Sequence, residues 1–360
     1  MAGPFKALGC VLCTAILVTA GICTWRFGPW YETTTASKKG QEELSTGQDL
    51  TALASTTCPT CCNGLESNCD LPVNQILFPT VHNAHSSFGN GFVAANNNQP
   101  LEAALVSGYR SLMLDSCMCD TSSLVESGYE AALEYATGKE ADGSNKEYNV
   151  GFCHHYCNAG VRVPSAVFAN IQTFLEVNPN EVLIIEFEIL DNSLADLYAA
   201  IDNSGLDQFV YRASTAPTPD TWPTLQQLID ANTRILLFAH GDQMQSCSTM
   251  TCPEGIFYTY DHFAQTVVED TTNCDSTEDR ANYSFFLMNH WKNTDLDLPS
   301  KDNSGLMNGY NSLDKRFGMC SENEHLPNFI AVDFWDLGDV VKFVSDENAK
   351  RAGNWTSTAK

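Results

Sequence analysis

The body of this chain alternates short apolar runs with amphipathic helical patterns, and this alternation constrains its fold more than any other feature. Strand-like runs lie at 75–81, 111–115, 149–152, 182–187, 234–239, 284–288 and 329–334, with a weaker run at 208–211. Apolar residues at helical spacing lie between them, at 166–177, 195–201 and 225–229. Such alternation predicts a parallel sheet, and uninterrupted apolar strands indicate burial on both faces. Seven or eight such units predict an α/β fold of the TIM type, a closed or distorted (β/α)₈ barrel.

Titratable side chains stand at or just beyond the ends of several of these runs. They are His82, Asp115, His154, Glu186 and Asp333. In a barrel the carboxyl ends of the strands converge on one face, so these side chains are expected to share one site. Two histidines at one site suit acid/base catalysis near neutral pH, because one imidazole accepts a proton while the other donates one. A lone buried histidine is more often a structural core residue, but two beside carboxylates favour catalysis.

Three short motifs carry a family resemblance: Val-His-Asn at 81–83, Leu-Met-Leu-Asp at 112–115 and Cys-His at 153–154. Together they resemble the X domain of phosphatidylinositol-specific phospholipase C, and they are closest to its secreted phospholipase C-like phosphodiesterase branch. Segments 172–182, 222–230 and 327–334 fit as well, so the resemblance runs from about residue 72 to about residue 345. It implies the same barrel fold and a phosphoric diester hydrolase acting on a phosphoinositide or glycosyl-inositol lipid at a membrane surface.

The resemblance also implies a role for each matching residue. In that family one histidine takes the proton from the inositol 2-hydroxyl, which attacks phosphorus, and a second histidine protonates the departing diacylglycerol oxygen. His82 matches the first histidine, and the Cys-His pattern selects His154 rather than His155 as the second. Asp115 and Asp333 complete the catalytic set. We expect Asp333 to orient His82, with a cap on the following helix as the structural alternative.

A metal site is the next expectation, because the phosphorane that forms needs positive charge beside it. Some family members place an arginine two residues after the strand-2 aspartate, where this chain has Cys117. Others use Ca²⁺ held by carboxylates and an asparagine. Asn83, Asp115 and Glu186 form an oxygen-rich set that suits Ca²⁺ or Mg²⁺, although Met113 stands where the calcium-dependent relatives have a glutamate.

Two rival functions stay open. The first is a glycerophosphodiesterase or sphingomyelinase-like enzyme, a class that typically carries acidic metal ligands near its first histidine. The second is a non-catalytic extracellular barrel used for binding, which the missing arginine keeps open. Turnover of a chromogenic inositol phosphodiester separates the enzyme from the binding protein.

The charge balance excludes some partners. The chain has 19 Lys and Arg against 44 Asp and Glu, a net charge of −25. This balance argues against nucleic acid, whose phosphates must be neutralised by cations. It also argues against electrostatic docking on anionic lipid. Apolar contact or an anchor must therefore hold the protein at a membrane.

The cysteines indicate an oxidising compartment. Of 15 cysteines, three lie in the apolar N-terminal segment, and the remaining even number suggests disulfides. The cluster at 58–69 also admits a zinc knuckle, a weaker interpretation in a secreted chain. Cys153 and Cys157 bracket His154 and are expected to staple its loop, with Cys117 and Cys119 as candidate partners.

Three regions follow from composition. Residues 1–24 read as a signal peptide or signal anchor, and residues 25–57 as a disordered Ser/Thr-rich stalk. Residues 58–350 form the expected barrel with its Cys-rich N-terminal segment. Sequons at Asn282 and Asn354 fit a glycoprotein that is secreted or faces the outside of a membrane.

Overall fold

A computed structural model describes residues 58–119, 149–154, 156–190, 194–241, 244, 246–247, 252–276, 283–322 and 326–354. The expected leader (1–24), the stalk (25–57), His155 and Asn282 lie outside these residues, as does the side chain of Asn354.

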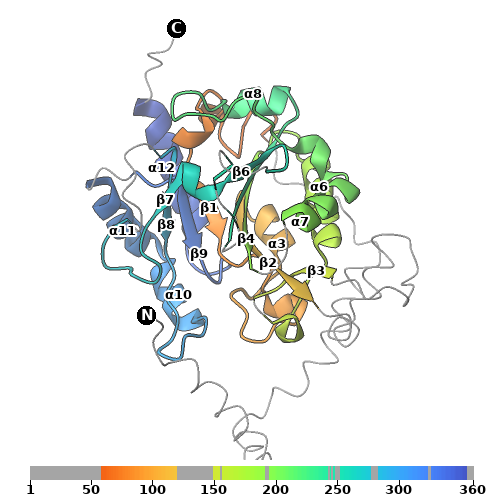
Figure 1. The fold of residues 1–360 in the computed structure, drawn as a ribbon. Helices are drawn as coiled ribbons and strands as arrows, with labels where there is room; N and C mark the ends of the chain where they lie inside the picture. The colour runs from red at the N-terminus through yellow and green to blue at the C-terminus, as the bar shows by residue number, and fades with distance from the viewer. Residues whose placement is uncertain are drawn as a thin grey trace, which may run out of the picture.

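Eight parallel strands follow one another in the cyclic order of a (β/α)₈ barrel (Figure 1). Hydrogen-bonded ladders run from β6 through β5, β4, β2, β1, β9 and β8 to β7. In the described part of the chain no ladder joins β6 to β7, which the short helix α9 (Thr259–His262) connects. The expected barrel is confirmed in its distorted form. Its strands are β1 (Phe78–Val81), β2 (Ser111–Cys119), β4 (Leu183–Ile189), β5 (Ile235–Gly241), β6 (Ile256–Tyr258), β7 (Phe263–Gln265), β8 (Phe285–Asn289) and β9 (Phe329–Val332).

Two of the segments that were expected to be barrel strands are not part of the barrel. The run at 149–152 forms β3 (Asn149–Phe152), but it pairs antiparallel with the outer half of β2 and lies off the barrel path. The weak run at 208–211 overlaps a 3-10 turn (Leu206–Phe209), followed by a single bridge from Val210 to Ile235. The barrel instead uses β6 and β7, each only three residues long.

Helices cover the outside of the sheet. Figure 1 shows α6 and α7 on one side of the barrel and α10, α11 and α12 on the other. Pro164 begins α6, where its missing N–H costs nothing, and a capping box between Thr224 and Gln227 begins α8. The helices are α3 (Leu101–Val106), α6 (Pro164–Val177), α7 (Leu194–Asn203), α8 (Leu225–Asp230), α10 (Lys301–Met307), α11 (Tyr310–Glu322) and α12 (Val340–Asn354).

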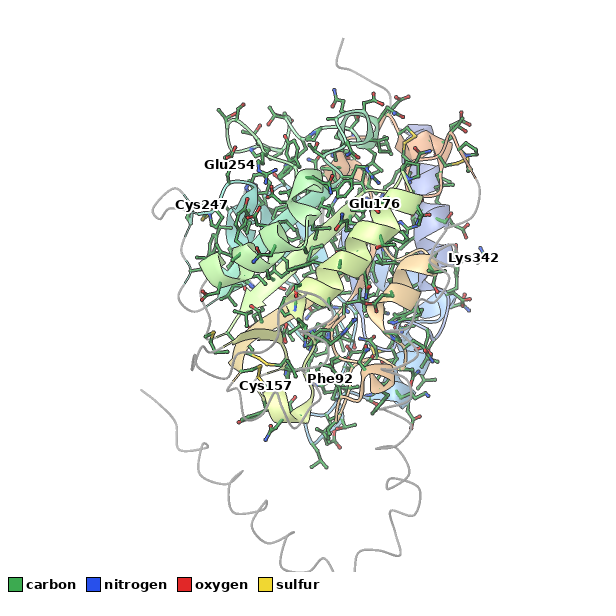
Figure 2. All side chains as sticks on the ribbon, turned by 90° about the vertical axis from the view of Figure 1, so that its right-hand side faces the viewer. Phe92, Cys157, Glu176, Cys247, Glu254 and Lys342 are labelled. Atoms are coloured by element: carbon green, nitrogen blue, oxygen red, sulfur yellow. A yellow bond between two sulfur atoms is a disulfide. The ribbon has the colours of Figure 1, made fainter. Side chains whose placement is uncertain are left out.

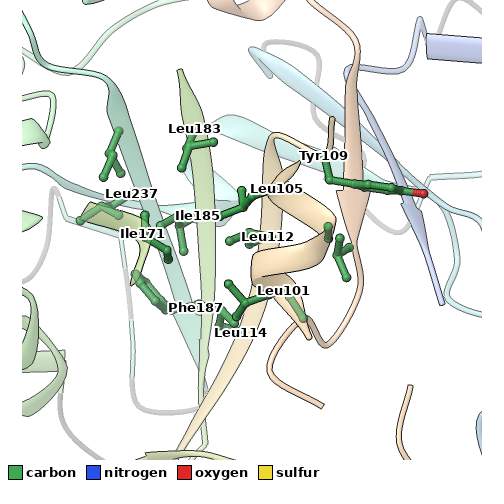
Figure 3. Close-up of a cluster of buried hydrophobic side chains, with 14 of the residues drawn as sticks. Leu101, Leu105, Tyr109, Leu112, Leu114, Ile171, Leu183, Ile185, Phe187 and Leu237 are labelled. Carbon is green, nitrogen blue, oxygen red and sulfur yellow. The ribbon is translucent and has the colours of Figure 1, made fainter. Parts of the chain in front are cut away.

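The alternation of side chains along each strand divides the core in two. On β4, Leu183, Ile185 and Phe187 face outward and pack with the helices, together with Leu112 and Leu237 of the neighbouring strands (Figure 3). The opposite face of the sheet fills the barrel, where Phe78, Phe238, Phe263, Phe285 and Phe329 pack ring against ring at centroid distances of 4.8–5.7 Å.

The barrel interior changes character along its axis. Four of its aromatic residues begin their strands, namely Phe78, Phe263, Phe285 and Phe329, and polar side chains occupy later inward positions. On β4 the inward series is Ile184, Glu186 and Glu188, because side chains on one face recur every second residue. The carboxyl end of the barrel is therefore the end equipped for chemistry.

The Cys-rich N-terminal segment lies at the other end of the barrel. Disulfides join Cys58 to Cys61 and Cys62 to Cys69, so the cluster does not form a zinc knuckle. The segment is held to α8, whose Leu225 N–H donates to the Leu71 carbonyl at 3.2 Å. Among the helices that the structure describes, none is both long and apolar enough to cross a membrane.

Candidate active site

A cavity of about 540 Å³ opens at the carboxyl ends of the strands. Six barrel strands place inward side chains there, at the strands' carboxyl ends or near them, which is the arrangement expected of a barrel active site. These side chains are His82 after β1, Asp115 on β2, Glu186 and Glu188 on β4, His240 on β5, Gln265 on β7 and Asn289 on β8.

His82 is held by a carboxylate and an aromatic ring. Its Nδ1 lies 2.8 Å from Asp333 Oδ1, and its ring stacks on Trp291 with centroids 4.2 Å apart and planes 7° from parallel. The register explains the first contact: Val81 pairs with Val332, so the next residues of both strands emerge side by side. Asn96 Nδ2 donates to the same Asp333 oxygen at 3.2 Å. Because Nδ1 is engaged, Nε2 is the His82 nitrogen available to a substrate.

His154 forms a second imidazole–carboxylate pair. Its Nδ1–H donates to Asp115 Oδ2 at 2.7 Å, and the histidine side chain is 55% exposed while that of Asp115 is 6% exposed. The hydrogen bond to Asp115 raises the pKa of His154, although partial burial opposes it. Burial alone would raise the pKa of Asp115, but the hydrogen bond from His154 and the nearby imidazoles bring it below its usual value.

The antiparallel strand β3 brings His154 to Asp115. Asp115 stands in the middle of β2 rather than at its end, and the strand continues to pair with β3. The Cys153 N–H donates to the Asp115 carbonyl at 3.2 Å, immediately before His154. Close packing supports the pairing of β2 with β3, because a Cβ atom at Gly151 would lie 2.7 Å from the Cys119 sulfur.

Two disulfides fasten the same segment to β2. Cys117 bonds Cys153 and Cys119 bonds Cys157, which confirms the expected stapling of the His154 loop. Figure 2 shows Cys157 and Phe92 at the same end of the molecule. There the Val93 N–H donates to the Ala159 carbonyl at 2.7 Å, so the loop after β1 meets the loop that follows His154.

Asn83 lies between the two histidine pairs. It adopts a left-handed backbone with φ of 44°, which asparagine tolerates better than most residues. One end of its amide lies 3.0–3.1 Å from both Asp115 oxygens. With nitrogen at that end it donates two hydrogen bonds. With oxygen there, three acceptors would face one another, and a cation between them would be needed.

Glu186, the third residue of the expected oxygen set, lies in the same cavity. Burial, with the negative charge of nearby Glu188 and Asp115, raises the pKa of Glu186 to about 8. No lysine or arginine lines the cavity in the part of the chain that the structure describes. Crowded carboxylates without a cationic side chain form a donor set of hard oxygens, which suits Ca²⁺ or Mg²⁺. The structure thus brings Asn83, Asp115 and Glu186 to one cavity.

Several cavity residues escaped the sequence prediction. His240 follows a predicted strand just as His82 does, so the same signal was present; burial lowers its pKa to about 4. Glu188 follows Glu186 at the spacing of one strand face. Trp291 and Asn96 carried no local signal, because their contacts depend on how loops fold over the barrel mouth.

Comparison with known proteins identifies the family to which this chain is similar. The family model described as PI-PLC X 1 matches residues 136–348, which include His154, Glu186 and Asp333 but not His82 or Asp115. PI-PLC X domain-containing protein 1 of Arthroderma benhamiae is 24% identical over 316 residues, covering 83% of this chain and 90% of that protein. A PI-PLC X domain-containing protein of Arabidopsis thaliana is 24% identical over 186 residues, or 48% of this chain and 41% of that protein.

Two bacterial enzymes of known structure are similar at lower levels. A phosphatidylinositol-specific phospholipase C from Listeria monocytogenes shares 15% identity at a TM-score of 0.47, covering 79% of this chain and 96% of that chain. A calcium-dependent phosphoinositol-specific phospholipase C from a Pseudomonas species shares 10% identity at a TM-score of 0.39, covering 76% and 94%. The barrel assignment rests on the strand order. The family-model match spans more than half of the sequence, and the chain belongs to the PI-PLC X domain family.

Proposed function

We propose that this protein is a phosphoric diester hydrolase of the phospholipase C type, acting on a phosphoinositide or glycosyl-inositol lipid. One observation carries the proposal: His82 and His154 line one cavity, and each imidazole is paired with a carboxylate, His82 with the buried Asp333 and His154 with Asp115. Two positioned histidines can serve as base and acid in the same reaction.

The geometry suggests which histidine takes which role. His82 is the base: Asp333 holds Nδ1, and Nε2 accepts the proton of the inositol 2-hydroxyl as its oxygen attacks phosphorus. His154 is the acid, since the hydrogen bond to Asp115 raises its pKa and favours the protonated form. It gives its proton to the diacylglycerol oxygen as the bond from phosphorus to that oxygen breaks. The products are diacylglycerol and a cyclic inositol phosphodiester.

A divalent ion belongs to the proposal. Asn83, Asp115 and Glu186 would hold Ca²⁺ or Mg²⁺, and that ion would supply positive charge beside the phosphorane. The position two residues after Asp115 is Cys117, which is engaged in a disulfide and provides no charge.

Exposed apolar side chains at the rim of the cavity favour a substrate that is embedded in lipid. Four side chains that line the mouth are apolar or aromatic and exposed: Val93 at 72%, Tyr156 at 71%, Leu298 at 47% and Val268 at 45%. Exposed apolar groups around a polar cavity can contact acyl chains while the head group enters. This contact would replace electrostatic docking, which the negative net charge disfavours.

The proposed location is outside the cytoplasm, either secreted or on the extracellular face of a membrane. All twelve cysteines from Cys58 onward are paired in six disulfides, a usage typical of oxidising compartments.

Turnover of a chromogenic inositol phosphodiester tests the function. We expect activity in the chain from Cys58 onward, with His82→Ala and His154→Ala each lowering kcat by roughly 10²-fold or more. His155→Ala is the matched control and should cost far less. Activity that survives both primary substitutions would remove the two-histidine mechanism, and a folded protein inactive on every phosphodiester would favour a binding role.

A further inference from the structure

We infer that four cysteines next to the His154 loop form a thiol–disulfide exchange site, which takes a low-molecular-weight thiol at Cys157 and re-pairs its two disulfides. The four, called the sulfur cluster below, are Cys117, Cys119, Cys153 and Cys157, and none of these residues lines the cavity. The exchange itself is independent of the proposed function, whereas its consequence for activity rests on that function.

The sulfur atoms of the cluster lie close enough to change partners. All four Sγ atoms are within 4.8 Å of one another. Besides its bonded partner, Cys153 Sγ has Cys157 Sγ at 3.2 Å and Cys119 Sγ at 3.9 Å. In the part of the chain that the structure describes, no other cysteines gather three sulfurs this closely. Each sulfur of the cluster can therefore reach the other disulfide with little movement of the backbone.

The pairing of β2 with β3 places two of these sulfurs. Cys117 and Cys119 lie two residues apart on β2, so their side chains point to the same face of the strand. Across the ladder Cys117 pairs with Gly151, where no side chain occupies the space that the sulfurs need.

The chain after β3 brings the other two sulfurs to the same place. Cys153 and Cys157 are separated by a tight turn, in which the Tyr156 N–H donates to the His154 carbonyl at 2.8 Å. Val163 packs with the four cysteines in a small apolar cluster separate from the main core. Re-pairing these sulfurs therefore leaves the packing of the barrel in place.

Solvent reaches the sulfur cluster at Cys157. The other three cysteines are at most 1% exposed, whereas Cys157 is 8% exposed and follows the exposed Tyr156. Figure 2 shows Cys157 at the end of the molecule where Phe92 also lies. All four sulfurs are engaged in disulfides, so the attacking thiol must come from outside. Since attack requires access to a disulfide sulfur, the Cys119–Cys157 bond opens first.

The exchange consists of three sulfur transfers. The outside thiolate bonds to Cys157 Sγ, which breaks the Cys119–Cys157 bond and leaves Cys119 as a thiolate. Cys119 then bonds to Cys153, and Cys117 departs as a thiolate. Finally Cys117 bonds to Cys157 and expels the outside thiolate. Two new disulfides, Cys119–Cys153 and Cys117–Cys157, replace the original two without net oxidation or reduction.

Re-pairing moves the anchor of the His154 loop. In the structure Cys153 is bonded to Cys117, two residues beyond Asp115, and His154 Nδ1 lies 2.7 Å from Asp115 Oδ2. In the exchanged form Cys153 is bonded to Cys119, whose position is about 7 Å further along β2. The hydrogen bond between His154 and Asp115 is then lengthened or lost, and acid catalysis by His154 falls.

Disulfide mapping of the full-length protein in a buffer of reduced and oxidised glutathione tests the exchange. After incubation, free thiols are blocked with a maleimide to stop the reaction. Cyanogen bromide cleaves after Met118 and chymotrypsin cleaves after Tyr156, so the four cysteines of the sulfur cluster fall on separate peptides. The native and exchanged pairings then give linked peptides of different mass.

We expect the Cys119–Cys153 and Cys117–Cys157 peptides to appear together in glutathione and to be absent without it. The buried Cys274–Cys320 disulfide is the internal control. The sulfur cluster should react roughly 10-fold or more faster than this control, since access and a neighbouring sulfur both favour exchange. Recovery of the native pairs alone, or reaction as slow as that of the control, would overturn the inference.

The effect on His154 has its own measurements. Exchanged protein should show kcat on a chromogenic inositol phosphodiester reduced by roughly 10-fold or more. The NMR titration midpoint of His154 should fall, because the hydrogen bond to Asp115 raises its pKa in the native pairing. Replacing both Cys119 and Cys157 by serine leaves the Cys117–Cys153 disulfide without an exchange partner, and this variant should be insensitive to glutathione.

The outcomes separate this inference from the proposed function. Exchange that leaves both kcat and the His154 midpoint unchanged would remove the link to His154. Absence of turnover before any glutathione is added would count against the proposed function, and mapping with the NMR titration would still decide the inference. If the double serine variant does not fold, mapping of the parent protein decides it.

Discussion

Asp333 lies 2.8 Å from Nδ1 of His82 and is almost completely buried, so a carboxylate at the end of β9 fixes the ring that ends β1. A buried carboxylate in this position holds one tautomer of the imidazole and stabilises the imidazolium that forms when the ring accepts a proton. The His154–Asp115 pair repeats the relationship on the far side of Asn83, but its histidine is more than half exposed. The more enclosed pair suits the base, and the more open pair suits the acid at the leaving group.

The first prediction concerns Asp333→Asn. The amide keeps the shape of the carboxylate but loses its charge and can hold the wrong tautomer of His82. We expect kcat on a chromogenic inositol phosphodiester to fall on the order of 10²-fold to 10⁴-fold, with little change in KM. Asp336→Asn is the matched control, since Asp336 is an exposed carboxylate three residues away that pairs with Asn98. Equal losses in both variants would assign Asp333 a purely structural role.

The second prediction concerns pH. His154 has its pKa raised from the usual 6.5 by its hydrogen bond to Asp115, so it stays protonated to higher pH than an isolated histidine. Its contribution to stability is therefore fully present below the unfolded-state pKa and is lost as pH rises through the folded-state pKa. Asp115→Asn removes the charge and should lower the titration midpoint of His154. NMR titration of chelator-treated protein measures this directly, and an unchanged midpoint would contradict the assigned pair.

The sequence predicted that the titratable side chains of the site would share one end of the barrel, because they stand at or just beyond the ends of the apolar runs. In the structure His82 and Glu186 line one cavity, and the parallel register of β1 and β9 places Asp333 against His82. The sequence did not predict β6 and β7, because strands of three residues are too short to show periodicity. It also failed for β3, because nothing local to 149–152 reveals that the strand turns back on β2.

The third prediction concerns the disulfides. Peptide mapping without reduction should recover Cys117 joined to Cys153 and Cys119 joined to Cys157. Replacing Cys117 and Cys153 by serine should lower stability by about 2–5 kcal/mol, measured by denaturant unfolding. It should also lower kcat more than stability loss explains, because Cys153 adjoins His154.

The control for that variant is the serine pair at Cys58 and Cys61, which lie at the opposite end of the barrel. This pair closes a shorter loop and should leave kcat close to that of the parent protein. Comparable loss of kcat in both double variants would show that the disulfide near His154 acts only through general stability. Finding most thiols free in the parent protein would contradict the proposed oxidising compartment.

The last prediction concerns the metal. The cavity gathers Asn83, Asp115 and Glu186 without a lysine or arginine in its described lining, so a doubly negative phosphorane needs an added cation. Excess chelator should lower turnover by roughly 10²-fold or more, with recovery on adding Ca²⁺ or Mg²⁺. Elemental analysis should find a divalent ion in the untreated protein. Ca²⁺ should also raise the Tm of the parent protein, because a ligand that binds only the folded state stabilises it.

Substitutions of the proposed ligands distinguish an effect on metal binding from an effect on folding. Asp115→Asn and Glu186→Gln should each remove most of the Ca²⁺-dependent rise in Tm. Glu186→Gln should cost little metal-free stability, whereas Asp115→Asn also loses the contribution of the His154 pair, so the rise in Tm of each variant is measured against its own metal-free Tm. Glu176→Gln, on the exposed face of α6, is the control and should keep the full rise. Full activity in excess chelator, with no metal found by elemental analysis, would defeat the prediction. A lysine or arginine outside the described lining of the cavity would then have to supply the positive charge.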